Sequence, residues 1–169
     1  ATGNSITIDT DMNINNLTVN GTLIIGNNAT ARQLNLSGDI TVNSGGSVTV
    51  ADYAANHSIA LSGKLTNDGS FDLYRNAGKV ANLSMQGSAQ DISGSQMPVL
   101  NNLDIASGTT TLHVQLEVRN TLSIQAGATL NDGGRHIYLY GNMIPEGTFT
   151  ASGTMELGAA FAQNVTESI

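Results

Sequence analysis

The chain contains no cysteine and no tryptophan, and it has few aromatic residues of any kind. Without cysteine it has no disulfide framework, no thiol nucleophile and no zinc site of the cysteine type. Phe and Tyr supply only 4% of the 169 residues, whereas hydrophobic residues reach 40%. That apolar share is enough to fold, so we expect a core made of small aliphatic side chains.

Charge is also scarce, and most of it is negative. Charged residues make up 11% of the chain, with 6 basic against 13 acidic ones, for a net charge of -7. Nucleic-acid binders and proteins that dock on anionic membranes carry basic patches, so we predict neither partner. The longest aliphatic run, Leu23 to Ile25, falls far short of the ~20 apolar residues that span a bilayer. The chain opens at Ala1 without an initiator Met, so we expect processing or a longer parent protein.

Short apolar triplets, with a polar or small residue in the middle, are the commonest pattern in the sequence. Because side chains alternate across a strand, the outer two residues face one side and the middle residue the other. Gly, Asn, Asp and Ser fill the gaps, as in turns. We therefore expect an all-β protein in which Leu122 and Ile137 point inward. The triplets begin at Ile6, Leu17, Leu23, Leu34, Ile40, Val48, Ile59, Phe71, Leu83, Leu103, Leu112, Leu116, Leu122, Ile137 and Met155.

A long internal repeat runs through the chain. Segment 15–19 is similar to segment 101–105, and segment 38–42 is similar to segment 120–124. The stretch 86–95 also resembles 158–168. Residues 1–169 are thus expected to form one β-helix segment with two super-repeats of about 80 residues, at about 5–91 and 92–169. We expect this segment to be an excerpt of a longer array.

Two all-β architectures compete for this pattern. A β-sandwich uses longer strands at even spacing and more aromatic core residues. A right-handed parallel β-helix uses short strands, stacked aliphatic residues and Asn-rich corners. The short triplets favour the β-helix. With about 20–25 residues in each turn, the chain would hold about seven coils, and the β-sandwich is the alternative.

The repeated segments resemble those of a known family. The Asn-Asn-Leu segments at 15–19 and 101–105, the stretch 121–130, and the endings at 89–95 and 162–168 carry the resemblance. They are similar to the β-helical repeat regions of large secreted bacterial surface proteins, namely adhesin-like exoproteins of Bacteroidota and, more distantly, filamentous-haemagglutinin-type passengers. The resemblance implies secretion to the cell surface and a non-catalytic structural or adhesive role. It also implies neighbouring domains in a longer chain as partners, and possible contacts with glycans or other cell surfaces.

Catalytic chemistry has little support in the sequence. Glycoside hydrolysis needs two carboxylates about 5–10 Å apart, and the candidates Asp68 and Asp132 both lie in Asn-Asp-Gly segments, which are turn signals. We therefore predict that the chain is not an enzyme. A polysaccharide-active enzyme fragment stays open as an alternative.

One segment has the alternating oxygen ligands of a calcium loop. Asp9, Asp11 and Asn13 supply these oxygens, but Asn20 stands where such a loop needs its final Glu, and the Gly at the sixth position is missing. The same alternation also describes one face of a strand. Calcium is thus a weak candidate, and we predict no other cofactor.

Aromatic residues gather once near the end of the chain. Tyr138 and Tyr140 lie two residues apart, so they share a strand face, with Arg135 and His136 close by in sequence. Exposed aromatic rings can stack on sugars. These four residues are our candidate ligand-binding set, and a carbohydrate-binding β-helix module is the alternative function. A strand face at the exit of a turn, without a ligand, gives the same pattern.

Overall fold

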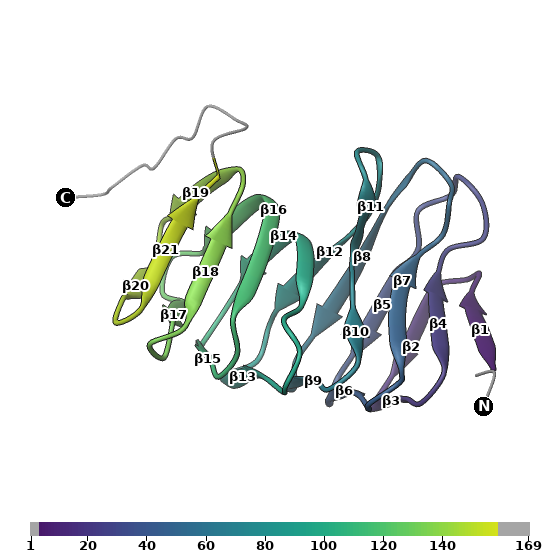
Figure 1. The fold of residues 1–169 in the computed structure, drawn as a ribbon, viewed down its shortest axis with the longest axis horizontal. Helices are drawn as coiled ribbons and strands as arrows, with labels where there is room; N and C mark the ends of the chain where they lie inside the picture. The colour runs from purple at the N-terminus through teal and green to yellow at the C-terminus, as the bar shows by residue number, and fades with distance from the viewer. Residues whose placement is uncertain (1–3, 159–169) are drawn as a thin grey trace.

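A computed structural model describes residues 4–158, and within them it contains strands and no helix. The strands wind as a right-handed parallel β-solenoid, with the N-terminus at one end and the last described coil at the other (Figure 1). Its third sheet has seven strands, one from each coil. The predicted β-helix of about seven coils is confirmed. The β-sandwich alternative is wrong, because all strand pairs except that of β11 and β12 are parallel.

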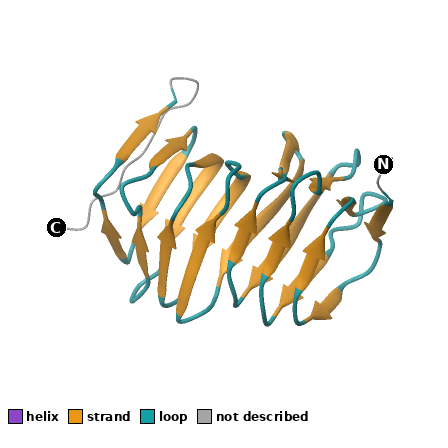
Figure 2. Ribbon diagram, turned by 60° about the horizontal axis from the view of Figure 1, so that its bottom comes forward, coloured by secondary structure: helices purple, strands orange, loops and turns teal. Residues whose placement is uncertain are grey.

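Three sheets run along the solenoid, and Figure 2 shows the loops confined to the corners between them. Sheet A contains β1 (Ser5–Ile8), β4 (Thr22–Ile25), β7 (Ser47–Val50) and β10 (Ser70–Phe71). Sheet B contains β2 (Met12–Ile14), β5 (Gln33–Leu36), β8 (Ala55–Leu61), β11 (Tyr74–Asn76), β12 (Lys79–Met85), β14 (Val99–Ile105), β16 (Leu116–Ile124), β18 (His136–Leu139), β19 (Asn142–Pro145) and β21 (Thr154–Leu157). Sheet C contains β3 (Leu17–Val19), β6 (Ile40–Val42), β9 (Leu65–Asn67), β13 (Ala89–Ser93), β15 (Thr109–Leu112), β17 (Thr129–Asn131) and β20 (Thr148–Thr150).

The core is a set of aliphatic stacks inside the coils. The register places Leu103 beside Leu122 and Leu122 beside Met143, so like residues cover one another from coil to coil. Leu122 is 0% and Ile137 is 1% exposed, which confirms both inward predictions. Since each coil packs mainly on its two neighbours, stability is expected to be nearly a sum over coils and their contacts.

Several inward positions of sheet C are polar. Asn67, Gln90 and Thr110 are all buried. The amide of Gln90 donates to the carbonyl oxygens of Leu61 (2.9 Å) and Gly63 (2.7 Å), and its own oxygen accepts from the Gly87 N–H. Gln90 therefore satisfies backbone groups of the neighbouring turns, and Asn67 donates to the carbonyl oxygen of Gln96 (3.0 Å), whereas the hydroxyl of Thr110 has no hydrogen-bond partner among the described residues.

The cross-section of the solenoid changes halfway along. Sheet A ends at β10, and Asp72 then forms a parallel bridge with Val99 at the start of β14. From there, β14 and β16 each turn the corner as one continuous strand, with a register shift between Leu100 and Asn102. The first part of β16 pairs with β18 and its last part pairs with β19. One long bent strand thus replaces two strands and a loop.

The structural repeat is the single coil. Leu17, which the internal repeat aligns with Leu103, lies in sheet C, whereas Leu103 lies in sheet B. Likewise Ile40 is in sheet C and its aligned partner Leu122 is in sheet B. The similar segments therefore occupy different faces of the solenoid. The matched ending at 158–168 lies almost wholly outside the described residues.

Candidate functional site

A groove of about 710 Å³ lies on the outer corner where the coils turn from the side of sheet A to sheet B. One side comes from the hairpin of β11 and β12, which projects beyond the coil (Figure 1) and contributes Tyr74 and Val80. The other side comes from the turn between β18 and β19, with Tyr140 and Asn142. The groove therefore collects side chains from several coils, between β8 and β19.

Arg119 lines this groove and contacts two of its aromatic rings. Its guanidinium carbon is 4.6 Å from the ring centroid of Tyr140 and 5.9 Å from that of Tyr74. The guanidinium also pairs with the carboxylate of Glu117, a residue that is only 8% exposed. Cation–π contact and the ion pair together hold the guanidinium in place and compensate its charge.

Hydrogen-bonded rows of asparagine amides join this groove to the neighbouring hollow, with Asn56, Asn101 and Asn120 lining the groove. The Nδ2 of Asn101 donates to Oδ1 of Asn82 (2.7 Å), and Asn82 donates in turn to Asn56 (2.7 Å). One position further along, Asn120 donates to Asn102 (2.8 Å). Each step joins neighbouring coils, so the amides follow the spacing of the strands. These rows close the corner and leave a polar surface.

Two glycines seat Tyr140 in the groove. A Cβ on Gly141 would collide with the carbonyl oxygen of Asn120, so the chain after Tyr140 can approach β16 only because this residue is glycine. A Cβ on Gly158 would collide with the ring of Tyr140. Both close approaches fix the ring beside Arg119.

The structure divides the four predicted ligand-binding residues between two places. Tyr140 lines the groove, whereas Arg135 and His136 line a separate hollow of about 590 Å³ together with His113. Tyr138 stacks on His136 with ring centroids 4.2 Å apart, and His136 lies 3.3 Å from a carboxylate oxygen of Glu156. Sequence reasoning missed Tyr74 and Arg119, because they come from other coils and carry no local signal.

The predicted calcium ligands take part in contacts between coils. Oδ1 of Asp11 accepts from the Gln33 N–H (2.9 Å), and Oδ1 of Asn13 accepts from Asn35 Nδ2 (2.8 Å). Asp9 is exposed between β1 and β2. Among residues 4–158, no three His, Cys, Asp or Glu side chains come together as they would around a metal ion. Within this part of the chain, Asp9, Asp11 and Asn13 therefore have no additional acidic or histidine side chains beside them to complete a calcium site.

Asp132 is the most strongly held carboxylate of the described chain. Its oxygens accept from the backbone N–H groups of Gly134, Ser152 and Gly153 and from the Ser152 hydroxyl, all at 2.8 to 3.0 Å. Burial pushes the pKa of Asp132 upward, but these hydrogen bonds outweigh it and leave the pKa below its usual value. The other candidate acid, Asp68, accepts from the Ser95 N–H. Both acids therefore act as turn residues.

Two clusters of opposite charges lie on the surface. Lys64 contacts Asp91 at 2.6 Å, and His113 lies 3.2 Å from the same carboxylate. The hydrogen bond from Lys64 is the main reason why the pKa of Asp91 lies below its usual value. Elsewhere the hydrogen bond from Lys79 and the charge of Arg75 lower the pKa of Asp52. Such exposed pairs add little stability.

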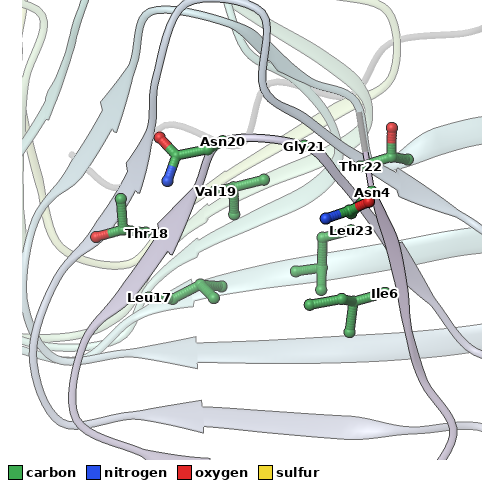
Figure 3. A pocket seen from close by; sticks show the side chains of 9 residues that line it. All are labelled: Asn4, Ile6, Leu17, Thr18, Val19, Asn20, Gly21, Thr22 and Leu23. Atoms are coloured by element: carbon green, nitrogen blue, oxygen red, sulfur yellow. The ribbon is translucent and has the colours of Figure 1, made fainter. Parts of the chain in front are cut away.

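The first coil presents an open end of the core. Figure 3 shows the side chains of Ile6, Leu17, Val19 and Leu23 around a hollow of about 340 Å³ at this end. Ile6 is 66% exposed, the highest value among the large apolar residues described. The end therefore combines apolar surface with strands β1 to β3, each of which pairs on one side only.

Comparison of the chain with protein-family models, with curated proteins and with solved structures finds no match. Within residues 4–158 there is also no helix long and apolar enough to cross a membrane.

Proposed function

We propose that the chain is a non-catalytic, stiff segment of a secreted bacterial cell-surface protein, where it acts as a stalk or adhesin rod. The observation that carries the proposal is the unbroken stacking of the coils. Sheet C continues through all seven coils, and the aliphatic core beneath it forms one cluster from Ile8 to Met143. A packed core without a break has no place at which the rod can bend easily. The secreted, surface location is supported by the resemblance of the repeats.

The open end of the first coil supports the proposal that neighbouring domains continue the rod. Strands β1 to β3 present unpaired edges, and Ile6 and Leu17 lie in the hollow beside them. Unpaired edges of this kind invite further strands. A preceding coil or cap, stacked in the same register, would bury both the edges and these side chains.

Stiffness can be measured by distances between spin labels, because the chain has no cysteine that would compete for labelling. Thr10→Cys and Ala151→Cys place labels at exposed positions in the first and last coils. We expect one narrow distance distribution centred at or beyond about 29 Å, which is six strand spacings of about 4.8 Å. A broad distribution would contradict the rod.

A second label pair is the control for this measurement. Thr10→Cys with Ser95→Cys spans only the wider coils, and both positions are exposed. A rigid rod gives similar widths for the short and the long pair. A long pair that is clearly broader than the short one would reveal a hinge where sheet A ends.

The location is tested on intact producing cells. A membrane-impermeant amine reagent should label Lys64, whose side chain is 55% exposed, without cell lysis. Labelling that requires lysis would contradict the surface location and leave the measured stiffness unaffected.

A further inference from the structure

We propose that the groove containing Tyr74, Arg119 and Tyr140 binds a neutral oligosaccharide lying parallel to the axis of the solenoid. This goes beyond the rod function, because a spacer needs no ligand. The proposal rests on the shape of the groove, on its compensated charge and on the kinds of side chain that line it.

The shape of the groove fits a short linear chain better than a single sugar. The groove reaches from Asn56 on β8 to Asn142 on β19, and β8, β12, β14, β16 and β19 are successive neighbours in sheet B. Four strand spacings of about 4.8 Å give a span of about 19 Å. A second hollow of about 370 Å³ adjoins it across the hydrogen bond from Asn120 to Asn102. The polar track therefore has room for several sugar rings.

The compensated charge of the groove favours an uncharged ligand. Among residues 4–158, Arg119 is the one basic residue that lines the groove, and its guanidinium already pairs with Glu117. An anionic ligand would have to compete with this carboxylate, which is nearly buried. The remaining guanidinium N–H groups can still donate to a hydroxyl or ether oxygen.

The side chains match the two surfaces of a sugar ring. The C–H face of a pyranose is apolar and gains free energy when it is buried against an aromatic ring such as that of Tyr74, beside Ala77 and Val80. Its hydroxyls need donors and acceptors close together, and each asparagine amide offers both. Asn101 and Asn120 present such amides on successive strands. A chain along the axis would meet polar partners from one coil after another.

The binding test uses four neutral probes, which are the tetrasaccharides of cellulose, xylan, mannan and laminarin, and one acidic probe, tetragalacturonate. We expect at least one neutral probe to bind with a Kd below about 1 mM by calorimetry. In nuclear magnetic resonance spectra of the isotope-labelled protein, the side-chain amide signals of Asn101 and Asn120 should shift when the probe is added. If no neutral probe binds, or if tetragalacturonate binds more tightly than all of them, the proposal is wrong.

Three variants locate the site. Tyr74→Ala removes the ring and should weaken binding at least about tenfold, which corresponds to about 1.4 kcal/mol. Tyr74→Phe keeps the ring and should bind within about threefold of the parent chain. Tyr53→Ala removes an exposed ring outside the groove and should change nothing. Unchanged binding by folded Tyr74→Ala would overturn the proposal.

The label distances described above separate this proposal from the rod function. If no probe binds and the distributions of label distances are narrow, only the groove ligand is overturned. If a neutral probe binds and the distributions are broad, only the rod is overturned. If a probe is cleaved, the chain is an enzyme, and this outcome contradicts the non-catalytic role as well as simple binding.

Discussion

The two halves of the solenoid close the same kind of core with different lengths of chain. In the first half, the register of sheet C steps by 23 residues from Leu17 to Ile40 and by 25 from Ile40 to Leu65. From Ile92 to Leu112 the step is 20 residues, and the next two steps are 20 and 19. The second half uses fewer residues in each coil, because one bent strand turns the corner that the first half closes with a loop.

The corners differ in the residues that stabilise them. In the first half, His57 points inward at the corner, and its Nδ1 accepts from the Arg32 N–H at 2.9 Å. At the start of the second half Asn101 takes this place, at the end of a row of amides that begins with Asn56 and Asn82. The difference shows that a corner can be held by one buried ring or by side chains that repeat from coil to coil. Only the repeating solution leaves an open polar groove.

The largest expected effect comes from a charge placed in the core of the second half. Leu122→Asp buries an unpaired carboxylate at a position that is 0% exposed, and should cost at least about 3 kcal/mol of unfolding free energy. Because coils unfold nearly independently from an end, hydrogen exchange should show protection lost in β16 to β19 and kept in β4 to β8.

The matched control places the same charge on the outer surface. Thr129→Asp lies on the outward face of β17 between Thr109 and Thr148, and should change stability by less than about 0.5 kcal/mol. A melting temperature of Leu122→Asp equal to that of the parent chain would contradict the inward placement of Leu122.

The next effect tests the carboxylate that holds a turn of the second half. Asp132→Asn keeps the shape but loses the charge that accepts from Gly134, Ser152 and Gly153, and should cost about 2 kcal/mol. Because the folded pKa of Asp132 lies below the unfolded value near 4, its contribution is full above that pH and is lost as the pH falls through the folded pKa. Denaturant unfolding of both proteins from pH 7 to pH 2 measures this. Equal stability at pH 7 would contradict it.

A smaller effect compares the amide row that leads into the second half with an exposed amide pair of the first coils. Asn82→Ala removes a side chain that donates to Asn56 and accepts from Asn101, a buried residue, and should cost about 1–2 kcal/mol. Asn43→Ala removes the exposed hydrogen bond to Asn20 in the first half and should cost less than about 0.5 kcal/mol. If chemical denaturation gave equal costs, the corner would not depend on the amide row from Asn56 to Asn101.

The smallest effect is a pH slope that belongs to the first half. Burial, followed by the charge of Arg32, lowers the pKa of His57. The unfolded chain therefore binds the proton more readily, so stability is complete above pH of about 6.5 and falls as the pH drops below it. His57→Asn should remove this loss in melting curves between pH 7.5 and pH 5, whereas His113→Asn, an exposed control, should keep it. A slope that survives in His57→Asn would assign the effect to another group.

The sequence was informative wherever a strand carries two inward aliphatic residues. The triplets at Ile40, Val48 and Leu122 became β6, β7 and part of β16, because alternation follows directly from strand geometry. The pattern missed β13 and β15, whose inward positions include Gln90 and Thr110. Gln90 is buried because backbone groups of neighbouring turns form hydrogen bonds with it, and Thr110 is buried without a hydrogen-bond partner among the described residues. A single sequence does not reveal either environment.

The candidate site was predictable only in part for a similar reason. Alternation predicted that Tyr138 and Tyr140 share a strand face, but β18 ends at Leu139, and of the two only Tyr140 lines the groove. Tyr74 and Arg119 reach it from a hairpin and from another coil, and their approach depends on the register of the stacked coils. The internal repeat gave little help, because two of its aligned pairs of segments, 15–19 with 101–105 and 38–42 with 120–124, lie in different sheets.

Register is the central claim, and cross-strand nuclear Overhauser contacts between backbone protons test it most directly. In a parallel solenoid, contacts occur at a constant separation in residue number along each pair of strands, such as Ile40 with Leu65 and Thr41 with Thr66 in the first half. In the second half we expect contacts of Leu103 with Leu122 and of Asp104 with Ser123. Contacts whose two residue numbers move in opposite directions along a pair would show antiparallel strands and contradict the solenoid.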